Sequence, residues 1–192
     1  GSGQLGHGAF SGHITPISTS PTISAIDIAL GAKAACALLQ DGSVKCWGSN
    51  EYGQLGIGYN SAYPSSGLAH FSPQSSGAEI STKATSISMS WYAGSAYDHA
   101  CRMLENGDVM CWGWSSNDMF DLGIGDDPTP IRSPTNSPSM SGATQNVTLG
   151  GEHTCIVHTG GGSVSCFGDN YYGQFAGTSP FVWNSANGLP SG

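Results

Sequence analysis

Apolar and polar residues alternate with a period of two in three short stretches of the chain. These stretches are residues 26–31, 87–94 and 147–150. Such alternation is typical of a β-strand that buries one face and exposes the other. Each stretch precedes a longer pattern that also occurs three times, so the sequence predicts a repeated all-β unit.

The longer pattern, residues 36–48 in the first copy, reads as a β-hairpin. A loop at Gln40-Asp41-Gly42, with Gly42 as the left-handed residue of a type I turn plus bulge, places Cys36 opposite Cys46. Directly opposed residues have Cβ atoms roughly 4.5–5.5 Å apart, which is close to what a disulfide needs. The sequence therefore predicts that the hairpin is closed by its own disulfide.

The other two copies use the remaining cysteines in the same way. Residues 101–113 repeat the hairpin residue for residue, and residues 155–168 repeat it with a four-residue loop at 159–162. The predicted pairs are Cys36 with Cys46, Cys101 with Cys111, and Cys155 with Cys166. No C-x-x-C spacing favours a metal site instead, and paired cysteines predict an oxidising, extracellular or cell-surface location.

Composition predicts a thin core and an almost uncharged surface. Only 38% of the 192 residues are hydrophobic, 29 are glycine, and 9% are charged. Three hairpin disulfides would each contribute roughly 2.5–3 kcal/mol in the chain-entropy model, which offsets a thin core. A neutral surface of Ser, Thr, Asn and Gly suits glycan cover or close contact with neighbouring molecules.

The charge balance excludes two classes of partner. The net charge is −8 and the five cationic residues are scattered along the chain, whereas nucleic-acid binding needs clustered Lys and Arg. No apolar run approaches the ~18 residues of a membrane-spanning helix. With no initiator Met and no signal peptide, the chain is expected to derive from a longer precursor.

A glycine-rich turn follows each hairpin, at residues 50–58, 117–125 and 170–177. Segments rich in Ser, Thr and Pro come after the first two turns, at residues 59–83 and 126–141. Because their lengths differ between the copies, they are predicted to be surface loops.

The composite pattern of the first copy resembles a known repeat. It reads Gly-x-x-x-x-Cys-x-Leu-x-x-Asp-Gly-x-Val-x-Cys-Trp-Gly-Ser-Asn-x-Tyr-Gly-Gln-Leu-Gly over residues 31–56, which is similar to the regulator-of-chromosome-condensation repeat in its secreted, cysteine-bearing version. The resemblance implies a β-propeller in which each repeat forms one four-stranded blade, usually with seven blades in a closed ring. The His-Thr that often precedes the first cysteine is present at His153-Thr154, partial at His99-Ala100 and absent at Ala34-Ala35.

The repeat boundaries divide the chain into a partial blade tail (1–20), blade 1 with its linker (21–82), blade 2 with its linker (83–142), and blade 3 with a C-terminal tail (143–192). Residues 1–8 match the glycine-rich turn without a preceding hairpin. Three copies cannot close the ring that the resemblance implies. The expected fold is therefore an open or incomplete ring, completed by further repeats or by other chains.

Six aromatic residues fall into two groups. Trp47, Trp112 and Phe167 directly follow the second cysteine of each repeat and are predicted to pack between blades, with ligand stacking as the alternative. The second group has no counterparts among the copies and is a candidate protein interface, because Trp is favoured at buried contact centres. This group contains Trp91, Trp114 and Trp183.

Several residues are candidate glycosylation sites. Asn146-Val147-Thr148 is an N-glycan acceptor sequence, and alternation with Val147 points the Asn and Thr out of the blade. Thr129, Ser133 and Ser137 each precede a proline in one linker, which is typical of O-glycosylated stretches and equally of ordinary loops.

No motif predicts catalysis, a metal or a cofactor. Residues 1–6 read G-x-G-x-x-G but follow no strand, and residues 159–163 lack the Lys of a phosphate loop. His99 and His153 lie near cysteines, but a disulfide sulfur is not a nucleophilic thiolate. Asp126-Asp127 lack the third oxygen ligand of a calcium loop.

These observations predict a non-enzymatic extracellular structural protein that assembles with itself or with further repeats into an array or filament. The alternative is a secreted propeller module that binds or inhibits a protein ligand. Nucleotide exchange on a small GTPase, which is known for the resembled family, conflicts with the disulfides.

Overall fold

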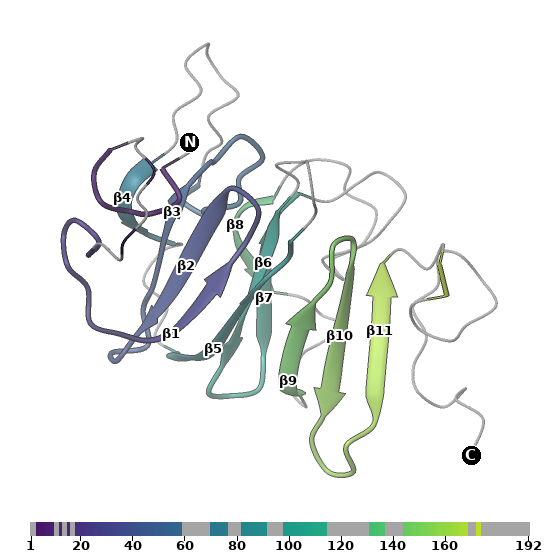
Figure 1. Ribbon diagram of the computed structural model, residues 1–192. Coiled ribbons are helices and arrows are strands. Elements are labelled where there is room, and N and C mark those ends of the chain that lie inside the picture. Colours follow the sequence, from purple (N-terminus) through teal and green to yellow (C-terminus); the bar gives the residue numbers. More distant parts are fainter. Residues whose placement is uncertain are drawn as a thin grey trace.

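The computed structural model describes residues 3–9, 12, 15, 18–58, 70–76, 82–91, 98–114, 131–136, 144–168 and 172–173. In these residues the chain forms antiparallel β-sheets and turns, with no helix (Figure 1). Accordingly, no helix in this part of the chain is long and apolar enough to span a membrane. The all-β prediction is confirmed.

Each sheet is one propeller blade. Blade 1 contains β1 (Ala25–Leu30), β2 (Ala34–Leu39), β3 (Val44–Gly48) and β4 (His70–Ser75) in that spatial order. Blade 2 contains β5 (Ala84–Met89), β6 (His99–Leu104), β7 (Val109–Gly113) and β8 (Ile131–Asn136). Blade 3 contains β9 (Thr144–Leu149), β10 (His153–His158) and β11 (Val164–Gly168).

The hairpin register is the one that the sequence predicts. Cys36 pairs with Cys46 across β2 and β3, and Gly42 in the loop has a φ of 84°. The same opposition occurs in the other two blades, and all three disulfides are formed, each with Cα atoms 4.1 Å apart. Loop chemistry and strand pairing together therefore place the sulfurs in reach of one another.

The loop prediction for residues 59–83 and 126–141 is wrong where β4 and β8 lie. Both strands pair with the end of the hairpin and complete a four-stranded blade. Each contains a proline, Pro73 or Pro134, at a point where the register with its neighbour shifts. A proline is tolerated at such irregularities and at sheet edges, but it masks the strand in the sequence.

The blades succeed one another side by side in an open ring (Figure 1). The two faces of a blade differ in composition. We term the face with the aromatic side chain that follows the second cysteine the leading face. In blade 1 this face carries Ile28, Leu30, Ala35, Ala37 and Trp47. We term the opposite face, which carries the disulfide, the trailing face; in blade 1 it holds Ala29, Cys36, Leu38, Val44 and Cys46.

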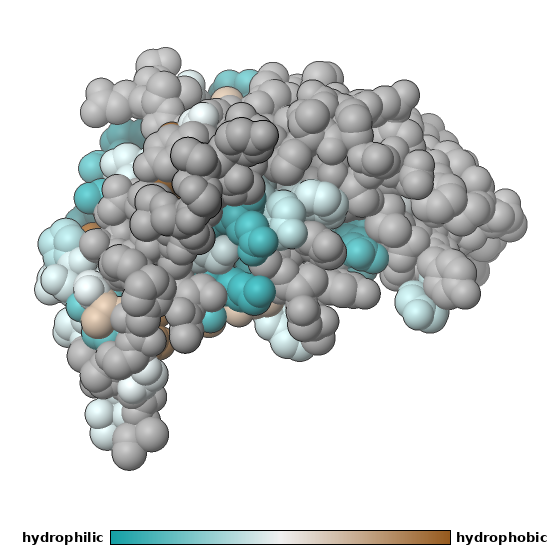
Figure 2. All heavy atoms as spheres, turned by 90° about the horizontal axis from the view of Figure 1, so that it is seen from above, coloured by the Kyte–Doolittle hydropathy of each residue, from teal (hydrophilic) through white to brown (hydrophobic). Residues whose placement is uncertain are grey.

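The hydrophobic core lies between blades. One cluster joins the trailing face of blade 1 to the leading face of blade 2, where Leu38 and Val44 meet Ile87 and Met89. A second cluster joins blade 2 to blade 3 in the same way. In Figure 2 the described atoms on the visible surface are mostly hydrophilic or neutral, as expected where apolar residues are kept for the inter-blade contacts.

The disulfides differ in accessibility, and this difference predicts their order of reduction. Cys36–Cys46 and Cys101–Cys111 are fully buried beneath a following blade, whereas Cys155 and Cys166 are only partly buried. We expect dithiothreitol under native conditions to open Cys155–Cys166 first. Alkylation at early times followed by peptide mass analysis would measure this. Equal rates at all three bonds would show that the blades do not protect the disulfides.

Candidate interaction surface

The turn after β3 is an ordered element that belongs to two blades. The Asn50 side-chain oxygen accepts a hydrogen bond from the backbone N–H of Leu55 at 3.1 Å. The Gln54 side-chain oxygen accepts one from the backbone N–H of Tyr52 at 2.8 Å. With Gly56 in the left-handed region at φ 65°, the turn presents Leu55 and the Gln54 carbonyl to blade 2.

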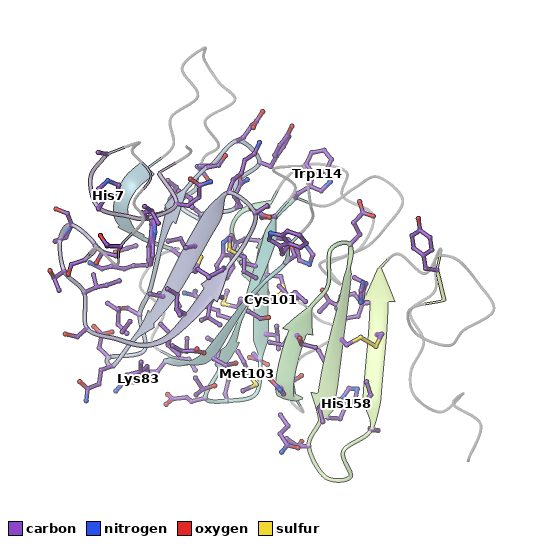
Figure 3. The ribbon with its side chains drawn as sticks, viewed as in Figure 1. His7, Lys83, Cys101, Met103, Trp114 and His158 are labelled. Atoms are coloured by element: carbon purple, nitrogen blue, oxygen red, sulfur yellow. A yellow bond between two sulfur atoms is a disulfide. The ribbon has the colours of Figure 1, made fainter. Side chains whose placement is uncertain are left out.

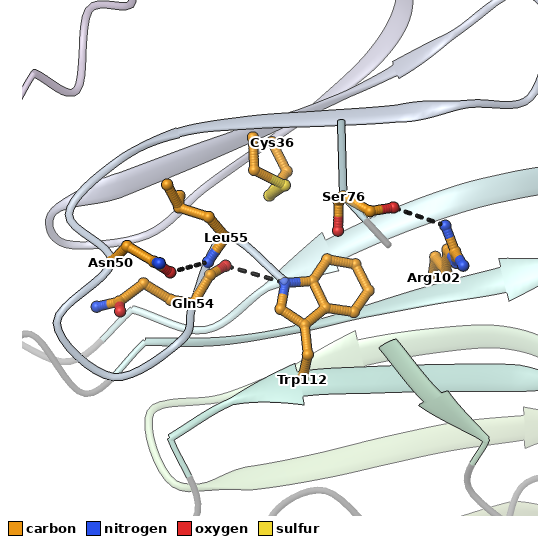
Figure 4. Close-up of a disulfide and its surroundings, with 8 residues drawn as sticks. Cys36, Asn50, Gln54, Leu55, Ser76, Arg102 and Trp112 are labelled. Atoms are coloured by element: carbon orange, nitrogen blue, oxygen red, sulfur yellow. Dashed lines mark hydrogen bonds between the residues drawn. A yellow bond between two sulfur atoms is a disulfide. The ribbon is translucent and has the colours of Figure 1, made fainter. Parts of the chain in front are cut away.

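Blade 2 receives this turn through a tryptophan. The indole N–H of Trp112 donates a hydrogen bond to the Gln54 carbonyl oxygen at 2.9 Å, beside the Cys36–Cys46 disulfide (Figure 4). Trp112 is fully buried. A Cβ on Gly56 would lie 2.9 Å from the indole, so only glycine permits this approach. We term this arrangement the turn–tryptophan contact.

Blade 1 makes the same contact with the start of the chain. The indole N–H of Trp47 donates to the Gln4 carbonyl oxygen at 2.7 Å. Gly6 has a φ of 65°, and a Cβ there would lie 2.7 Å from the indole nitrogen. The turn in residues 3–8 therefore covers blade 1 as the Gln54 turn covers blade 2.

Blade 3 has Phe167 at this position. Phe167 is buried in the cluster between blades 2 and 3, with Cys101 and Cys111. A phenyl ring fills the space but offers no N–H donor. The turn at residues 117–125 lies outside the described residues.

Asp98 ties blade 2 to blade 1 by hydrogen bonds. Its two carboxylate oxygens accept from the backbone N–H groups of Ala32 and Lys33, each at 3.0 Å. Burial raises the pKa of Asp98, whereas these two N–H groups and the charge of Lys33 act in the opposite direction. Asp98 is fully buried, so the carboxylate is held by donors from a neighbouring blade.

Arg102 is a second polar tie between the same blades. Its guanidinium donates to the Ser76 carbonyl oxygen at 3.2 Å (Figure 4) and to the Met110 sulfur at 3.6 Å. The side chain is buried, and this loss of water lowers the pKa of Arg102. The contact joins the end of blade 1 to the leading face of blade 2.

His99 lies between blades 2 and 3. Its backbone N–H donates to the Ser90 hydroxyl at 2.8 Å, and its ring Nε2 lies 3.5 Å from the Thr154 hydroxyl of blade 3. Burial, with a smaller effect of His153, lowers the pKa of His99 to about 3. The imidazole is therefore neutral at neutral pH.

The part of the leading face of blade 1 that lies on β1 is open, whereas Ala35, Ala37 and Trp47 on β2 and β3 are buried, with Ile23 packed against them. Ile28 and Leu30 are 56% and 64% exposed, although their register equivalents in blade 2, Ile87 and Met89, are each 7% exposed. Ile26 on the same strand is also exposed. These exposed apolar positions in blade 1 are the ones that, in blade 2, are buried against the preceding blade.

The trailing face of blade 3 is open as well. Val164 is 39% exposed, whereas its equivalents Val44 and Val109 are buried. The Cys155–Cys166 disulfide on this face is partly exposed. The series of three blades thus ends in a leading face at blade 1 and a trailing face at blade 3. Within the series, a trailing face and a leading face pack together at each contact.

Two of the three predicted interface tryptophans lie in the described residues, and their surroundings differ. Trp91 is 62% exposed after β5, and Trp114 packs edge-on against Tyr52 with ring centroids 4.7 Å apart (Figure 3). Trp183 lies outside the described residues.

The candidate glycosylation sites are also scattered. Asn146 and Thr148 are exposed on β9, while Val147 between them is buried. Ser133 lies in β8, not in a loop, and Thr129 and Ser137 lie outside the described residues.

In the described part of the chain, no group of three His, Cys, Asp or Glu side chains is placed to hold a metal ion. All six cysteines are in disulfides, so none is a thiol nucleophile. The arrangement supports binding through blade faces.

Sequence reasoning misses Asp98 and Arg102. Asp98 has no counterpart in the other blades, where Lys33 and Glu152 flank the hairpin. Arg102 has one available signal, because strand alternation puts it on the face of Ala100 and not that of Cys101. That signal does not identify the atoms that Arg102 contacts.

Comparison with known proteins agrees with the repeat pattern. The regulator of chromosome condensation (RCC1) repeat matches residues 25–54 and 145–174 in one form and residues 41–93 in another. The human probable E3 ubiquitin-protein ligase HERC6 is 33% identical over 186 residues, which cover 93% of this chain and 16% of that protein. The Arabidopsis thaliana ultraviolet-B receptor UVR8 is 31% identical over 177 residues, 90% of this chain and 36% of the receptor.

The chain thus spans well under half the length of these relatives. Among solved structures, yeast RCC1 (Prp20) bound to Kap60 superposes with a TM-score of 0.61 at 20% identity. The superposition covers 76% of this chain and 32% of the yeast protein, and it shows a shared blade fold.

Trp112→Phe tests the turn–tryptophan contact. The phenyl ring leaves the buried Gln54 carbonyl without its donor, so we expect the free energy of unfolding to fall by about 1–3 kcal/mol. Urea denaturation followed by circular dichroism would measure it. Trp91→Phe, at an exposed position, is the control and should change stability by less than about 0.5 kcal/mol. Equal effects of the two substitutions would contradict the contact's role.

Burial of neutral His99 predicts acid sensitivity. Its pKa falls from an ordinary 6.5 to about 3 on folding, so between these values the unfolded chain binds a proton that the folded chain does not. The stabilising contribution is complete above pH 6.5 and is lost as the pH falls toward 3, with a slope of up to about 1.4 kcal/mol per pH unit. His99→Gln should flatten the pH dependence of the unfolding free energy, measured by urea denaturation from pH 7 to 4. An unchanged slope in the variant would refute this assignment.

Proposed function

Because the chain belongs to the regulator of chromosome condensation (RCC1) repeat family, whose propeller repeats serve as protein-interaction modules, we propose that it is a non-enzymatic extracellular scaffold. Its blades extend an array by docking face to face. The leading face of blade 1 receives the trailing face of another blade of this kind, which a second copy of the chain carries on blade 3.

The observation that carries this proposal is the exposure of Ile28 and Leu30. The equivalent Ile87 and Met89 are buried by the blade in front of them. Burying a large aliphatic side chain contributes about 1.5–3 kcal/mol, so the exposed β1 side chains of this face favour association. A contiguous apolar surface of this sort marks an interaction site.

The nature of the partner follows from the two contacts inside the chain. In both, a trailing face with its disulfide covers a leading face with aliphatic residues and an aromatic ring. The trailing face of blade 3 shares with them the disulfide and the valine two residues before its second cysteine, and it is open. Such a contact joins unlike surfaces, so copies would form either a closed ring or an open filament.

The extracellular location is supported by the disulfides. Three hairpin bonds use every cysteine, and bonds of this kind persist in oxidising compartments. The low charged fraction of 9% also suits a surface that is kept in contact with neighbours.

A second candidate function is capture of a foreign protein, supported by the packing of Tyr52 against Trp114. These rings come from the blade 1 turn and from the residue directly after β7, so a partner here would bridge two blades. Trp and Tyr are favoured anchors in protein interfaces. Loss of binding on Trp114→Ala, with self-association unchanged, would favour this function over the scaffold.

Leu30→Lys tests the docking of blade 1. Because Leu30 is largely exposed, the variant should fold, but a charge placed under another blade weakens association by about tenfold or more in Kd. Sedimentation velocity of the unglycosylated chain over a concentration series measures this. Thr85→Lys, an exposed strand position in blade 2, adds the same charge and should leave association unchanged. A wild-type chain that stays monomeric throughout would overturn the proposal.

A further inference from the structure

The chain holds one N-glycan acceptor sequence, Asn146-Val147-Thr148, and the fold gives it a specific place. In β9, Asn146 pairs with Val157 and Thr148 pairs with Cys155. Val147 points into the cluster against blade 2, while Asn146 and Thr148 are exposed. The acceptor pair therefore lies on the trailing face of blade 3, together with the Cys155–Cys166 disulfide.

The same positions in blade 2 show what a following blade does to this part of the face. Ser86 pairs with Met103, and Ser88 pairs with Cys101, so they are the counterparts of Asn146 and Thr148. Blade 3 packs over this face: the Ser86 hydroxyl is buried and Ser88 is half-buried.

Blade 1 has Asp27 and Ala29 at these positions. Ala29 is buried beneath blade 2, while Asp27 is exposed at the margin of the contact. A blade docked on blade 3 would thus cover Thr148 and lie directly against Asn146.

We propose that Asn146 is an N-glycosylation site and that its glycan closes the trailing face of blade 3 to further blades. The inference rests on the proposed function, since it requires passage through a secretory compartment and docking of blades. In the modification, the Asn146 side-chain nitrogen bonds to the anomeric carbon of an oligosaccharide donor, a polyprenyl pyrophosphate. The bond from that carbon to the pyrophosphate oxygen breaks, and the amide nitrogen loses one proton.

The consequence is steric and polar. Packed sheets lie about 10 Å apart, and side chains fill the space between them. A hydrated, bulky oligosaccharide at Asn146 cannot lie in that space. Terminal units of repeat arrays need a polar outer face for solubility, and the glycan supplies one here.

Blade 1, at the opposite end of the series, has no glycan acceptor sequence. Ile26, Ile28 and Leu30 leave the β1 part of the leading face of blade 1 apolar and exposed. With the glycan in place, the chain accepts a blade only at blade 1. The glycosylated chain is an array end, and the unmodified chain is an internal subunit.

The test uses the full chain secreted from a eukaryotic host that attaches N-glycans, with two variants at an exposed position. Thr148→Ala removes the acceptor sequence and leaves Asn146, while Thr148→Ser keeps the acceptor and controls for the substitution. Intact mass before and after peptide-N-glycosidase treatment, with mapping of the Asn146 peptide, reports the modification. Sedimentation velocity over one concentration series reports assembly.

We expect the wild type and Thr148→Ser to exceed the polypeptide mass of 19.7 kDa, to lose the excess with the glycosidase, and to stay monomeric. Thr148→Ala and the enzymatically deglycosylated wild type should self-associate. A wild type without glycan at Asn146 would overturn the modification site, and equal association with and without glycan would overturn the closing role. If Thr148→Ala is itself monomeric, blade docking fails, while the mass still decides whether Asn146 is modified.

Discussion

The structure depends on burying an aromatic ring of one blade beneath the disulfide face and the turn of the repeat before it. No described blade has a core of its own, because the apolar side chains of its sheet pack against neighbouring blades or, in blade 1, also against Ile23. Trp112 shows this arrangement most fully: its ring fills the space beside Cys36–Cys46, and its N–H donates to the buried Gln54 carbonyl oxygen. Order in one blade therefore requires the presence of the next, which is the behaviour of a linear repeat protein.

The polar ties follow the same rule. Asp98, Arg102 and His99 are buried ionisable side chains, and each reaches an atom of an adjacent blade. In a chain with so few charges, these residues fix how the blades are rotated against each other, because a hydrogen bond is directional and apolar packing is not. Burial shifts the pKa of each of these side chains toward its neutral form.

Much of the blade could be predicted from the sequence, because its information is local. The loop around Gly42 sets the register, and the register alone brings Cys36 to Cys46. The fourth strands could not be located, since Pro73 and Pro134 hide them and their pairing is not local. The open faces were equally inaccessible to sequence reasoning: Ile28 and Ile87 look alike in the repeat, and only the presence or absence of a neighbour makes one exposed and the other buried.

The hydrogen bond from Trp47 to the Gln4 carbonyl has a consequence for how the number of repeats in such a chain can change. In the two contacts that the structure describes, a turn completes the blade after it, so the unit that recurs in the sequence is offset from the unit that packs. Duplication or loss of one whole repeat keeps turns and tryptophans in equal number, and every contact inside the array is still made. A duplication of half a repeat leaves either a tryptophan without a turn to cover it or a glycine-rich turn without a tryptophan to bind. Blade number can therefore vary among such proteins in whole steps while each individual contact stays the same.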